Sequence, residues 1–422
     1  MNPNYDLQER ASELLFLAQQ QDLNLATRRL MDFITDFELT KELREEAVMI
    51  RIDYNKSLLK DDSEQEQQKT PIINRILVWV QKVQQNTHSK KGNASEAFIN
   101  YDQLKEEFLR SRYFMYEPKD TEIAFDGSKL GKEYPSVGFS LQNISLQLKL
   151  GELTGIVGEN GNGKTTLLRI IAGDLGIYSG IIRYPAFNVP QEAWYLVKQN
   201  IAFIPQNLAN WKGLLKDNLH FSAANHGIFG SENEELVDFV IHRLGLTRYQ
   251  YATWNEISNG YKLRFELAKS LVWRPKLLIL DEPLANLDIN AKLLFMQDLR
   301  LLANSTRHPI SIVMSSQQLH EIESVVDNIV FIKEGKAIYN GKVAQIGEDR
   351  QQNSFELAGN FERAELYYIL KELGQISIDD TGQSLVVHVP RNIESSQVLN
   401  KIAAVKKIDY FRDISRSTRK LF

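Results

Sequence analysis

The 422-residue sequence contains no cysteine. Disulfide bonds, thiolate metal sites and catalysis by a thiol are therefore excluded, and a reducing compartment suits the chain. A long apolar run is also missing, since no stretch approaches the roughly 18 residues that suggest a membrane span. The first six residues show neither the basic nor the apolar region of a signal peptide. We expect a cytoplasmic protein whose role at a membrane needs a separate membrane partner.

An excess of one charge is lacking as well. Fifty Lys and Arg stand against 54 Asp and Glu, which gives a formal net charge of −4. No global basic field indicates a nucleic-acid or anionic-membrane binder, so we expect no direct contact with nucleic acid. Hydrophobic residues make up 43% of the chain, which is enough to build buried cores. At about 150 residues per domain, the length predicts roughly three domains.

The first 118 residues predict a helical domain. Apolar residues recur at helical spacing from Leu7 to Ala18, from Ala26 to Phe37 and, less regularly, from Ala47 to Leu59. This stretch contains no catalytic constellation. We therefore expect residues 1–118 to form an interaction or regulatory domain with an unidentified protein partner.

A fourth helix in this domain is predicted to begin at Pro71. Thr70 resembles an N-cap, and proline is favoured at the first helical position that follows it. The polar residues 61–69 before this point and 84–97 further on are interpreted as exposed loops or linkers.

The character of the sequence changes near Tyr134. Short β-branched runs alternate with helical stretches, the pattern of an α/β domain with a largely parallel sheet, which we assign to residues 119–348. Residues 349–422 predict a third domain with the element order of a ferredoxin-like α+β unit. Its expected elements are strands at 354–357, 375–378, 384–388 and 407–411 and helices at 361–373 and 395–404.

The second domain contains a complete phosphate-binding loop. The apolar strand Leu153–Val157 runs directly into Gly158-Glu159-Asn160-Gly161-Asn162-Gly163-Lys164-Thr165-Thr166, and a helical run follows. Glycines let consecutive N–H groups turn toward polyphosphate oxygens, and the helix N-terminus adds the positive end of its dipole. We expect residues 160–166 to bind ATP, with Lys164 on the β- and γ-phosphates and the Thr165 hydroxyl on Mg²⁺.

Two adjacent carboxylates follow a second apolar strand. Leu277–Leu280 ends in Asp281 and Glu282. Because side chains alternate along a strand, the two acids point in different directions and can take different roles. We expect Asp281 to hold the Mg²⁺ shell and Glu282 to polarise the attacking water as a general base.

Further motifs resemble those of one family. Phe203-Ile204-Pro205-Gln206 resembles the Q-loop of ABC-type ATPases, Ile257-Ser258-Asn259-Gly260-Tyr261 resembles their signature sequence, and Pro283-Leu284-Ala285-Asn286-Leu287-Asp288 resembles their D-loop. All occur in family order, and the resemblance covers roughly residues 130 to 345. It implies the P-loop NTPase fold of an ABC cassette, ATP hydrolysis with Mg²⁺, and a head-to-tail homodimer or a dimer with a second cassette.

The resemblance also implies roles for single residues. Gln206 takes part in Mg²⁺ coordination and catalysis, and Ser258 and Gly260 contact the γ-phosphate held by the opposite subunit. Tyr134 is a candidate for stacking on adenine, with a plain core or surface tyrosine as the alternative. The last domain looks like the small regulatory appendage of ABC-2-type exporter ATPases.

The signature departs from the family pattern at two positions. Asn259 stands in place of a glycine and Tyr261 in place of a glutamine. Asparagine tolerates left-handed backbone better than other non-glycine residues, so we expect the turn to survive.

The switch region departs more sharply. In the run from Met314 to Asp327, the position of the usual histidine holds Gln317, while His320 is expected to face solvent on the following helix. Glutamine can donate a hydrogen bond to a γ-phosphate but cannot carry the cationic form available to histidine. Our hypothesis is that Glu282 still supports ATP hydrolysis but that this hydrolysis is slow.

Two functions remain open. The first is the ATP-binding subunit of an ABC transporter, an exporter, which lies on the inner face of the cell membrane and contacts a separate transmembrane permease through residues 206–218. The second is a soluble ATP-dependent switch whose partner is recruited by residues 1–118. The short helical insert between Gln206 and Ser258 and the exporter-like C-terminal unit favour the first function, which is our leading hypothesis. Gln317 and the N-terminal helices, which such transporter subunits do not normally carry, favour the second function.

Overall fold

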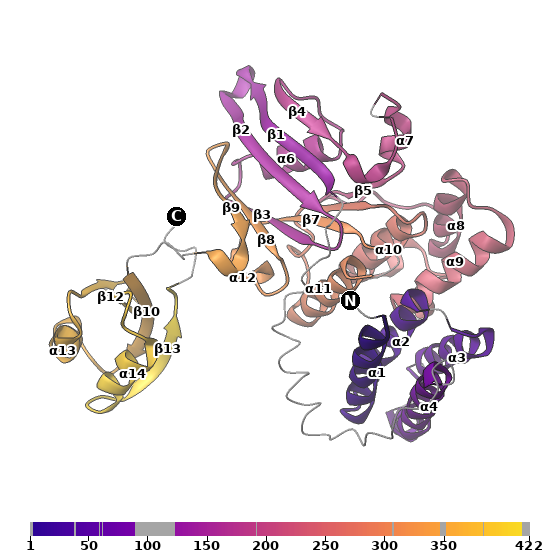
Figure 1. Ribbon diagram of the computed structural model, residues 1–422, viewed down its shortest axis with the longest axis horizontal. Coiled ribbons are helices and arrows are strands. Elements are labelled where there is room, and N and C mark those ends of the chain that lie inside the picture. The colour runs from indigo at the N-terminus through magenta and orange to yellow at the C-terminus, as the bar shows by residue number, and fades with distance from the viewer. Residues whose placement is uncertain are drawn as a thin grey trace. The chain divides into compact units, whose positions relative to one another are not determined.

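The chain folds into two compact units, Met1–Asn340 and Gly341–Phe422 (Figure 1). The computed structural model describes residues 3–37, 39–58, 60, 62–88, 123–190, 192–305, 308–346, 352–382 and 384–415. Among these residues, no helix combines the length and the apolar character needed to cross a membrane.

Four helices form an N-terminal bundle. Asp22 and Thr40 cap the second and third of them, because each side chain accepts a hydrogen bond from the backbone N–H three residues further on. The apolar faces meet in one core, where the rings of Phe33 and Trp79 pack edge to face with centroids 5.4 Å apart. The helices are α1 (Pro3–Gln19), α2 (Leu23–Asp36), α3 (Lys41–Ser57) and α4 (Asp62–His88).

The prediction for the start of α4 was wrong. The helix begins at Asp62 and contains Pro71 in its interior, so residues 62–69 and 84–88 are helical where loops were expected. Residues 89–97 lie outside the described part of the chain. Glu, Gln and Lys before Pro71 are good helix formers. An interior proline costs about 3 kcal/mol or more, and the burial of Ile72 and Ile76 in the bundle core offsets this cost.

The cassette contains two sheets. An antiparallel sheet has the order β2-β1-β4, and a six-stranded sheet has the order β5-β6-β7-β3-β8-β9. Strands β5, β6, β7, β3 and β8 pair in parallel. The strands are β1 (Ile123–Tyr134), β2 (Phe139–Lys149), β3 (Leu153–Val157), β4 (Ser179–Arg183), β5 (Ile201–Ile204), β6 (Leu277–Leu280), β7 (Ser311–Ser316), β8 (Asn328–Lys333) and β9 (Lys336–Lys342).

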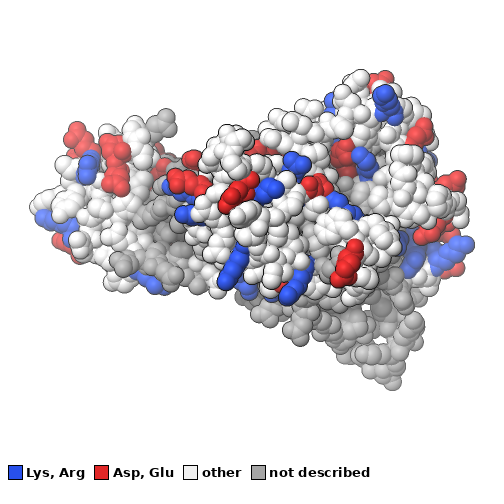
Figure 2. Space-filling model, turned by 90° about the horizontal axis from the view of Figure 1, so that it is seen from above, with Lys and Arg blue, Asp and Glu red and all other residues white. Residues whose placement is uncertain are grey.

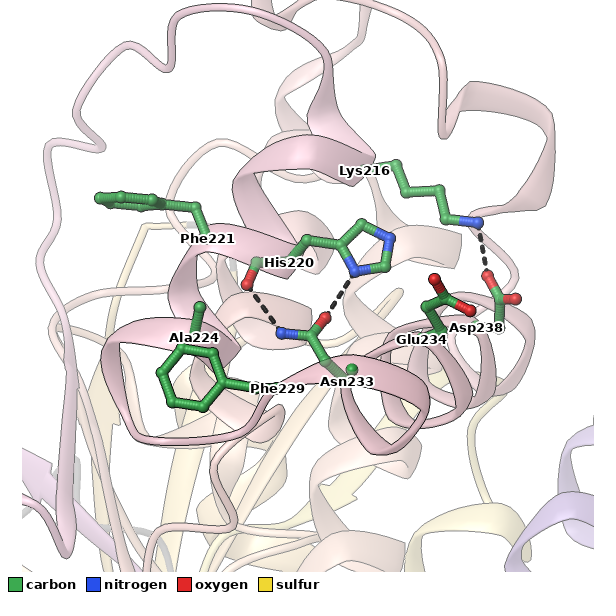
Figure 3. Close-up of a pocket in the computed structure, with 9 residues that line it drawn as sticks. Lys216, His220, Phe221, Ala224, Phe229, Asn233, Glu234 and Asp238 are labelled. Atoms are coloured by element: carbon green, nitrogen blue, oxygen red, sulfur yellow. Dashed lines mark hydrogen bonds and ion pairs between the residues drawn. The ribbon is translucent and has the colours of Figure 1, made fainter.

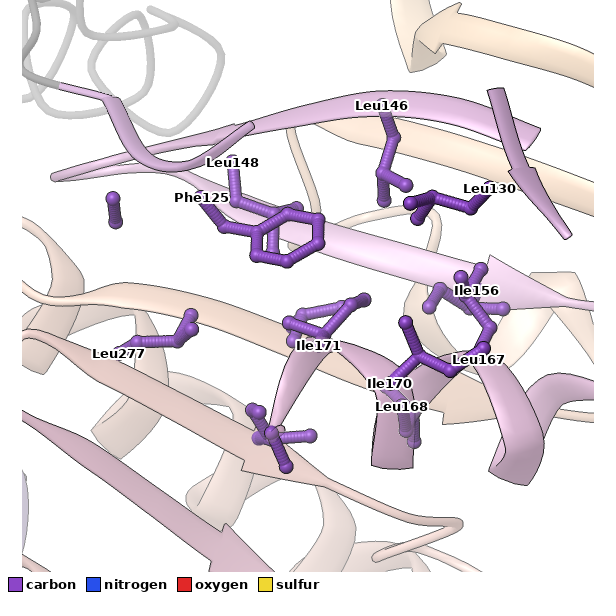
Figure 4. Packing of buried hydrophobic residues seen from close by; sticks show 14 of the residues in the cluster. Phe125, Leu130, Leu146, Leu148, Ile156, Leu167, Leu168, Ile170, Ile171 and Leu277 are labelled. Atoms are coloured by element: carbon purple, nitrogen blue, oxygen red, sulfur yellow. The ribbon is translucent and has the colours of Figure 1, made fainter. Parts of the chain in front are cut away.

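One hydrophobic cluster joins both sheets to α6 (Lys164–Ile171), the helix that follows the phosphate-binding loop. Figure 4 shows Phe125 and Leu148 of the antiparallel sheet above Ile171 of α6, with Ile156 and Leu277 of the parallel sheet nearby. All five side chains are fully buried. The start of α6 is therefore held by the core of the cassette, which fixes the loop before it.

Of the remaining helices of the cassette, the three that follow β5 form a helical lobe at the side of the parallel sheet (Figure 1). This lobe comprises α8 (Leu215–Asn225), α9 (Gly230–Arg243) and α10 (Asn259–Leu271). Asn259 is the first helical residue of α10, and its φ is not positive. The others are α7 (Trp194–Lys198), α11 (Ile289–Ala303) and α12 (Leu319–Ile322).

The second unit has the predicted ferredoxin-like order. Its sheet order is β11-β12-β10-β13 with every pair antiparallel, the arrangement of a split β-α-β motif. The unit begins at Gly341, slightly before the predicted boundary at 349. Its elements are β10 (Gln352–Gly359), α13 (Arg363–Leu370), β11 (Ser377–Asp380), β12 (Leu385–Pro390), α14 (Ser395–Ala403) and β13 (Ile408–Asp413). The predicted fold class, an ABC cassette with helical and ferredoxin-like parts, is thus confirmed.

Candidate active site

The phosphate-binding loop runs from β3 to α6, and three of its glycines are required by its shape. A Cβ atom on Gly158 would lie 2.3 Å from the backbone oxygen of Ile332 in β8. Gly161 and Gly163 have φ angles of 81° and 99°, which side chains rarely adopt. A Cβ on Gly163 would also approach Phe139 and Leu141 to 2.7 Å. The loop therefore keeps its close packing against β2 and β8 only with glycine at these positions.

The loop is also tied to the neighbouring hairpin through Asn162. Its side-chain oxygen accepts a hydrogen bond of 2.8 Å from the backbone N–H of Glu334, in the two-residue turn between β8 and β9. Glu334 and Gly335 have φ angles of 48° and 75°, as such tight turns require. Asn160 and Gly161 are exposed, so this part of the loop is accessible to a ligand.

Lys164 lies inside the loop and is almost fully buried. Its ammonium group donates hydrogen bonds to the carbonyl oxygens of Gly158 and Glu159 at 2.8 and 3.1 Å. The same ammonium group is 3.3 Å from the Glu282 carboxylate. A buried cation held by carbonyl oxygens and one carboxylate is placed to exchange these partners for phosphate oxygens.

Glu282 is the centre of a small polar network. Its second carboxylate oxygen accepts hydrogen bonds from the amide groups of Gln206 at 2.9 Å and Gln317 at 2.8 Å. Lys164, Gln206, Glu282 and Gln317 all follow parallel strands, at the carboxyl edge where ligands bind in such sheets. The predicted residues therefore meet, and Gln317 lies within reach of Glu282.

Thr165 and Asp281 form the second part of the network. The Thr165 hydroxyl donates to one carboxylate oxygen of Asp281 at 2.8 Å, and the Ser315 hydroxyl donates to the other at 2.7 Å. Thr166 follows in the first turn of α6. A hydroxyl beside a carboxylate at a phosphate loop is the ligand set that Mg²⁺ takes together with substrate phosphates. Among the described residues, no cluster of three or more His, Cys, Asp or Glu able to hold a metal occurs.

Ser315 was missed in the sequence analysis as a functional residue. It is buried at the end of β7, and its oxygen also accepts the backbone N–H of Glu282 at 2.8 Å. Glu282 has a left-handed φ of 46°, a conformation that costs about 1–3 kcal/mol in a non-glycine residue. Ser315 thus supports both acids, and the only signal in the sequence was its position two residues before Gln317.

The signature residues lie apart from this network. Ser258 is the exposed N-cap residue of α10, and Gly260 lies in the first turn of that helix. A Cβ atom on Gly260 would lie 3.7 Å from Leu287 and 3.9 Å from Ala291, so the start of α10 packs beside the D-loop and α11. Within one chain these residues do not join the Lys164 network.

Tyr134 ends β1 and packs near Phe139, with ring centroids 6.3 Å apart. The Lys132 ammonium group lies 5.9 Å from the centre of its ring. Phe139 in turn contacts the phosphate loop at Gly163. Tyr134 therefore approaches the phosphate loop through Phe139, and its stacking on adenine stays a prediction. His320 is exposed on α12, as expected.

An open groove lies between α8 and α9 on the helical lobe (Figure 3). Its volume is about 590 Å³. His220 and Asn233 join its walls through two hydrogen bonds, and Lys216 pairs with Asp238 at 2.6 Å. Phe221, which is 67% exposed, lies at its margin. The groove combines an apolar rim with charges of both signs.

Charges of both signs are also interspersed over the face of the molecule shown in Figure 2. This mixture agrees with the small net charge of the chain. The absence of a nucleic-acid partner stays a prediction.

The fold and the site define a P-loop ATPase, and comparisons with known proteins name its family. The family profile of the ABC transporter matches residues 141–285. An uncharacterized ABC transporter ATP-binding protein of Methanocaldococcus jannaschii is 30% identical over 212 residues, which are 49% of this chain and 73% of that protein. The ABC transporter ATP-binding protein NatA of Bacillus subtilis is 27% identical, over 54% of this chain and 91% of NatA.

A solved structure of cbiO1 from Clostridium perfringens, described as part of the ABC transporter complex cbiONQ, is 27% identical. The match covers 52% of this chain and 89% of cbiO1, with a TM-score of 0.47. The chain belongs to the family of ABC transporter ATP-binding proteins. It is therefore an ATPase. The family binds ATP, normally with Mg²⁺, and its ATP-binding subunits dimerise and work with transmembrane subunits.

We expect Gln317→His to raise kcat several-fold, because an imidazolium stabilises developing phosphate charge better than a neutral amide. The variant also gains a pH dependence near the ordinary histidine pKa of about 6.5. Steady-state ATPase rates across pH 5.5–8.5 check both effects. Gln318→His, one residue further on and exposed, is the control. An unchanged or lower kcat for Gln317→His contradicts the slow-hydrolysis hypothesis.

Proposed function

We propose that this chain is the ATP-hydrolysing subunit of an exporter, which dimerises head to tail on ATP and drives separate membrane subunits from the inner face of the cell membrane. The observation that carries the dimer is the exposed start of α10. Gly260 has no positive φ, and a Cβ there would make only ordinary contacts, so the monomer does not require glycine. The close approach of a second molecule to this position does require glycine.

An apolar surface beside Gly260 supports the same interface. Ile289 and Leu293, in the first turns of α11, are 78% and 60% exposed, while Ala291 between them faces Gly260. Large exposed apolar residues next to a polar site indicate an interaction surface. A second copy of the chain that brings its own phosphate loop to Ser258 covers this surface.

In this proposal the residues of the site divide the work. Lys164 and the N–H groups of the phosphate loop bind the β- and γ-phosphates, where the cation stabilises the charge that develops. Thr165 and Asp281 hold Mg²⁺, which neutralises phosphate charge when bound. Glu282 takes the proton of the attacking water, and the Gln206 and Gln317 amides orient that water beside it.

The membrane subunit is proposed to contact residues 206–218 and the adjacent groove between α8 and α9. Phe221 and Phe229 are each 67% exposed there, which suits the apolar face of a partner helix. The export direction rests on the ferredoxin-like unit, which resembles the appendage of ABC-2-type exporter ATPases. Because the relatives are transporter proteins, the switch function is not favoured.

Native affinity purification from separated membrane and soluble fractions tests the transporter function. We expect a multi-span membrane protein to copurify and to leave the membrane together with this chain in detergent. Phe221→Asp is expected to lower its recovery, while Tyr195→Asp, an equally exposed aromatic residue on α7, leaves recovery unchanged. Recovery of only a non-membrane protein, lost when residues 1–118 are deleted, contradicts the proposal.

A further inference from the structure

The N-terminal bundle packs against the cassette through buried polar contacts. Arg28 on α2 is 2% exposed, and one nitrogen of its guanidinium group lies 2.6 Å from both carboxylate oxygens of Asp298 on α11. Asp298 is 4% exposed. A second guanidinium nitrogen donates to the carbonyl oxygen of Leu244, directly after α9, at 3.3 Å. One bundle side chain therefore holds both the helical lobe and the helix that follows the D-loop.

Arg51 on α3 reinforces the contact with the helical lobe. Its Nε donates to the carbonyl oxygen of His242 at 2.8 Å, in the last turn of α9. This carbonyl also accepts the backbone N–H of Gly245 at 3.2 Å, and a cation at the end of α9 meets the negative end of the helix dipole. Burial, and next the nearby charge of Arg28, lower the pKa of Arg51 to about 9, so the side chain remains charged near neutral pH.

The backbone of the lobe is shaped to admit these two arginines. Gly245 has a φ of 68°, and a Cβ atom on it would lie 3.1 Å from a guanidinium nitrogen of Arg28 and of Arg51. Any larger residue crowds both cations and strains the turn. Close approach of bundle and lobe therefore depends on glycine at this position.

Further bonds flank this pair on each side. Arg243 at the end of α9 pairs with Asp32 of α2, and Asn55 donates to the Thr247 hydroxyl at 3.1 Å. At the other end of the interface, Ser305 beyond α11 donates to Asp36 at 2.7 Å. The bundle thus touches the lobe and α11 at several points.

Both contacted elements lead directly to the signature. The chain continues from Gly245 to the N-cap Ser258, while α11 begins at the D-loop and packs against Gly260 through Ala291. We infer that Arg28 is a positioning residue for ATP hydrolysis, because its bonds to Asp298 and Leu244 set the placement of the signature helix relative to the D-loop. The inference rests on the proposed head-to-tail use of Ser258 and Gly260.

The test uses the full chain with Arg28→Gln, which removes the positive charge and the bonds of the guanidinium group to Asp298 and Leu244. We expect kcat to fall between about tenfold and 10²-fold, as displacement of a positioning group does. The Kd of an ATP analogue, which binds at the phosphate loop, should change less than twofold. Hydrogen exchange should quicken in residues 240–258. The double variant Arg28→Asp with Asp298→Arg restores the ion pair in reverse but not the bond to the Leu244 carbonyl oxygen, so it should recover part of the lost kcat.

The control is Arg75→Gln, because Arg75 forms an equally short 2.6 Å pair with Asp53 inside the bundle but does not reach the cassette. Its kcat should match that of the unaltered chain. If Arg28→Gln does not fold, Arg28→Lys keeps the cation without the paired bonds and carries the same expectation. A kcat within twofold of the unaltered chain, an increase in kcat, or equal losses of kcat and nucleotide binding without rescue overturns the inference.

The same measurements separate this inference from the proposed function. If the unaltered chain hydrolyses ATP without dimerising, the head-to-tail proposal fails. Faster hydrogen exchange in residues 240–258 of Arg28→Gln would then still show that the bundle stabilises the helical lobe. The inferred effect of Arg28 on the signature would be rejected.

Discussion

Glu282→Gln is expected to lower kcat by about 10²–10⁴-fold, the range that a general base contributes. The change keeps the shape of the side chain but removes the carboxylate that lies 3.3 Å from the Lys164 ammonium group. Lys164 is then released toward phosphate oxygens, so ATP affinity should hold or increase. Single-turnover hydrolysis and light scattering with Mg²⁺ and ATP are expected to reveal an ATP-bound dimer that persists.

A matched loss of charge nearby provides the control. Glu321→Gln removes a carboxylate on α12 that pairs with Lys292 at 2.6 Å and lies outside the Glu282 network. Its kcat should remain within a few-fold of the unaltered chain. A decrease of less than tenfold for Glu282→Gln would show that another group takes the proton of the attacking water.

Gly260→Glu is expected to reduce ATP turnover by about 10²-fold, because a carboxylate facing a bound γ-phosphate across an interface costs several kcal/mol. The monomer should tolerate the change. The atom nearest to a Cβ at this position is 3.7 Å away. An acidic residue in the first turn of α10 also interacts favourably with the positive end of the helix dipole. ATP binding to the monomer and its melting temperature should therefore be kept, while the ATP-dependent dimer is lost in size-exclusion chromatography.

Ser396→Glu introduces a glutamate at an equivalent place, an exposed residue in the first turn of α14 in the other compact unit. It should leave turnover and dimer formation unchanged. Full activity of Gly260→Glu would mean that the start of α10 does not approach a γ-phosphate, and the head-to-tail arrangement would then be rejected.

Local sequence determined much of the fold and the residues that meet at the site. Leu153–Val157 and the loop after it are contiguous, so strand, glycine turn and helix start follow from the residues themselves. The ferredoxin-like order was equally readable, because each short element shows its own periodicity and the turns between them are brief. Pro71 misled the prediction, since a local helix-start signal was overridden by packing of α4 along its length.

Tertiary structure alone decided which distant groups support one another. Ser315 reaches Asp281 and Glu282 only because β7 pairs with β6 in parallel register, and pairing partners are not encoded in either strand. Arg28 meets Asp298 across 270 positions of sequence, because the bundle packs on the helical lobe and α11. Sequence periodicity reports which face of an element is buried. What that face is buried against depends on the summed packing of the whole chain, which no local pattern contains.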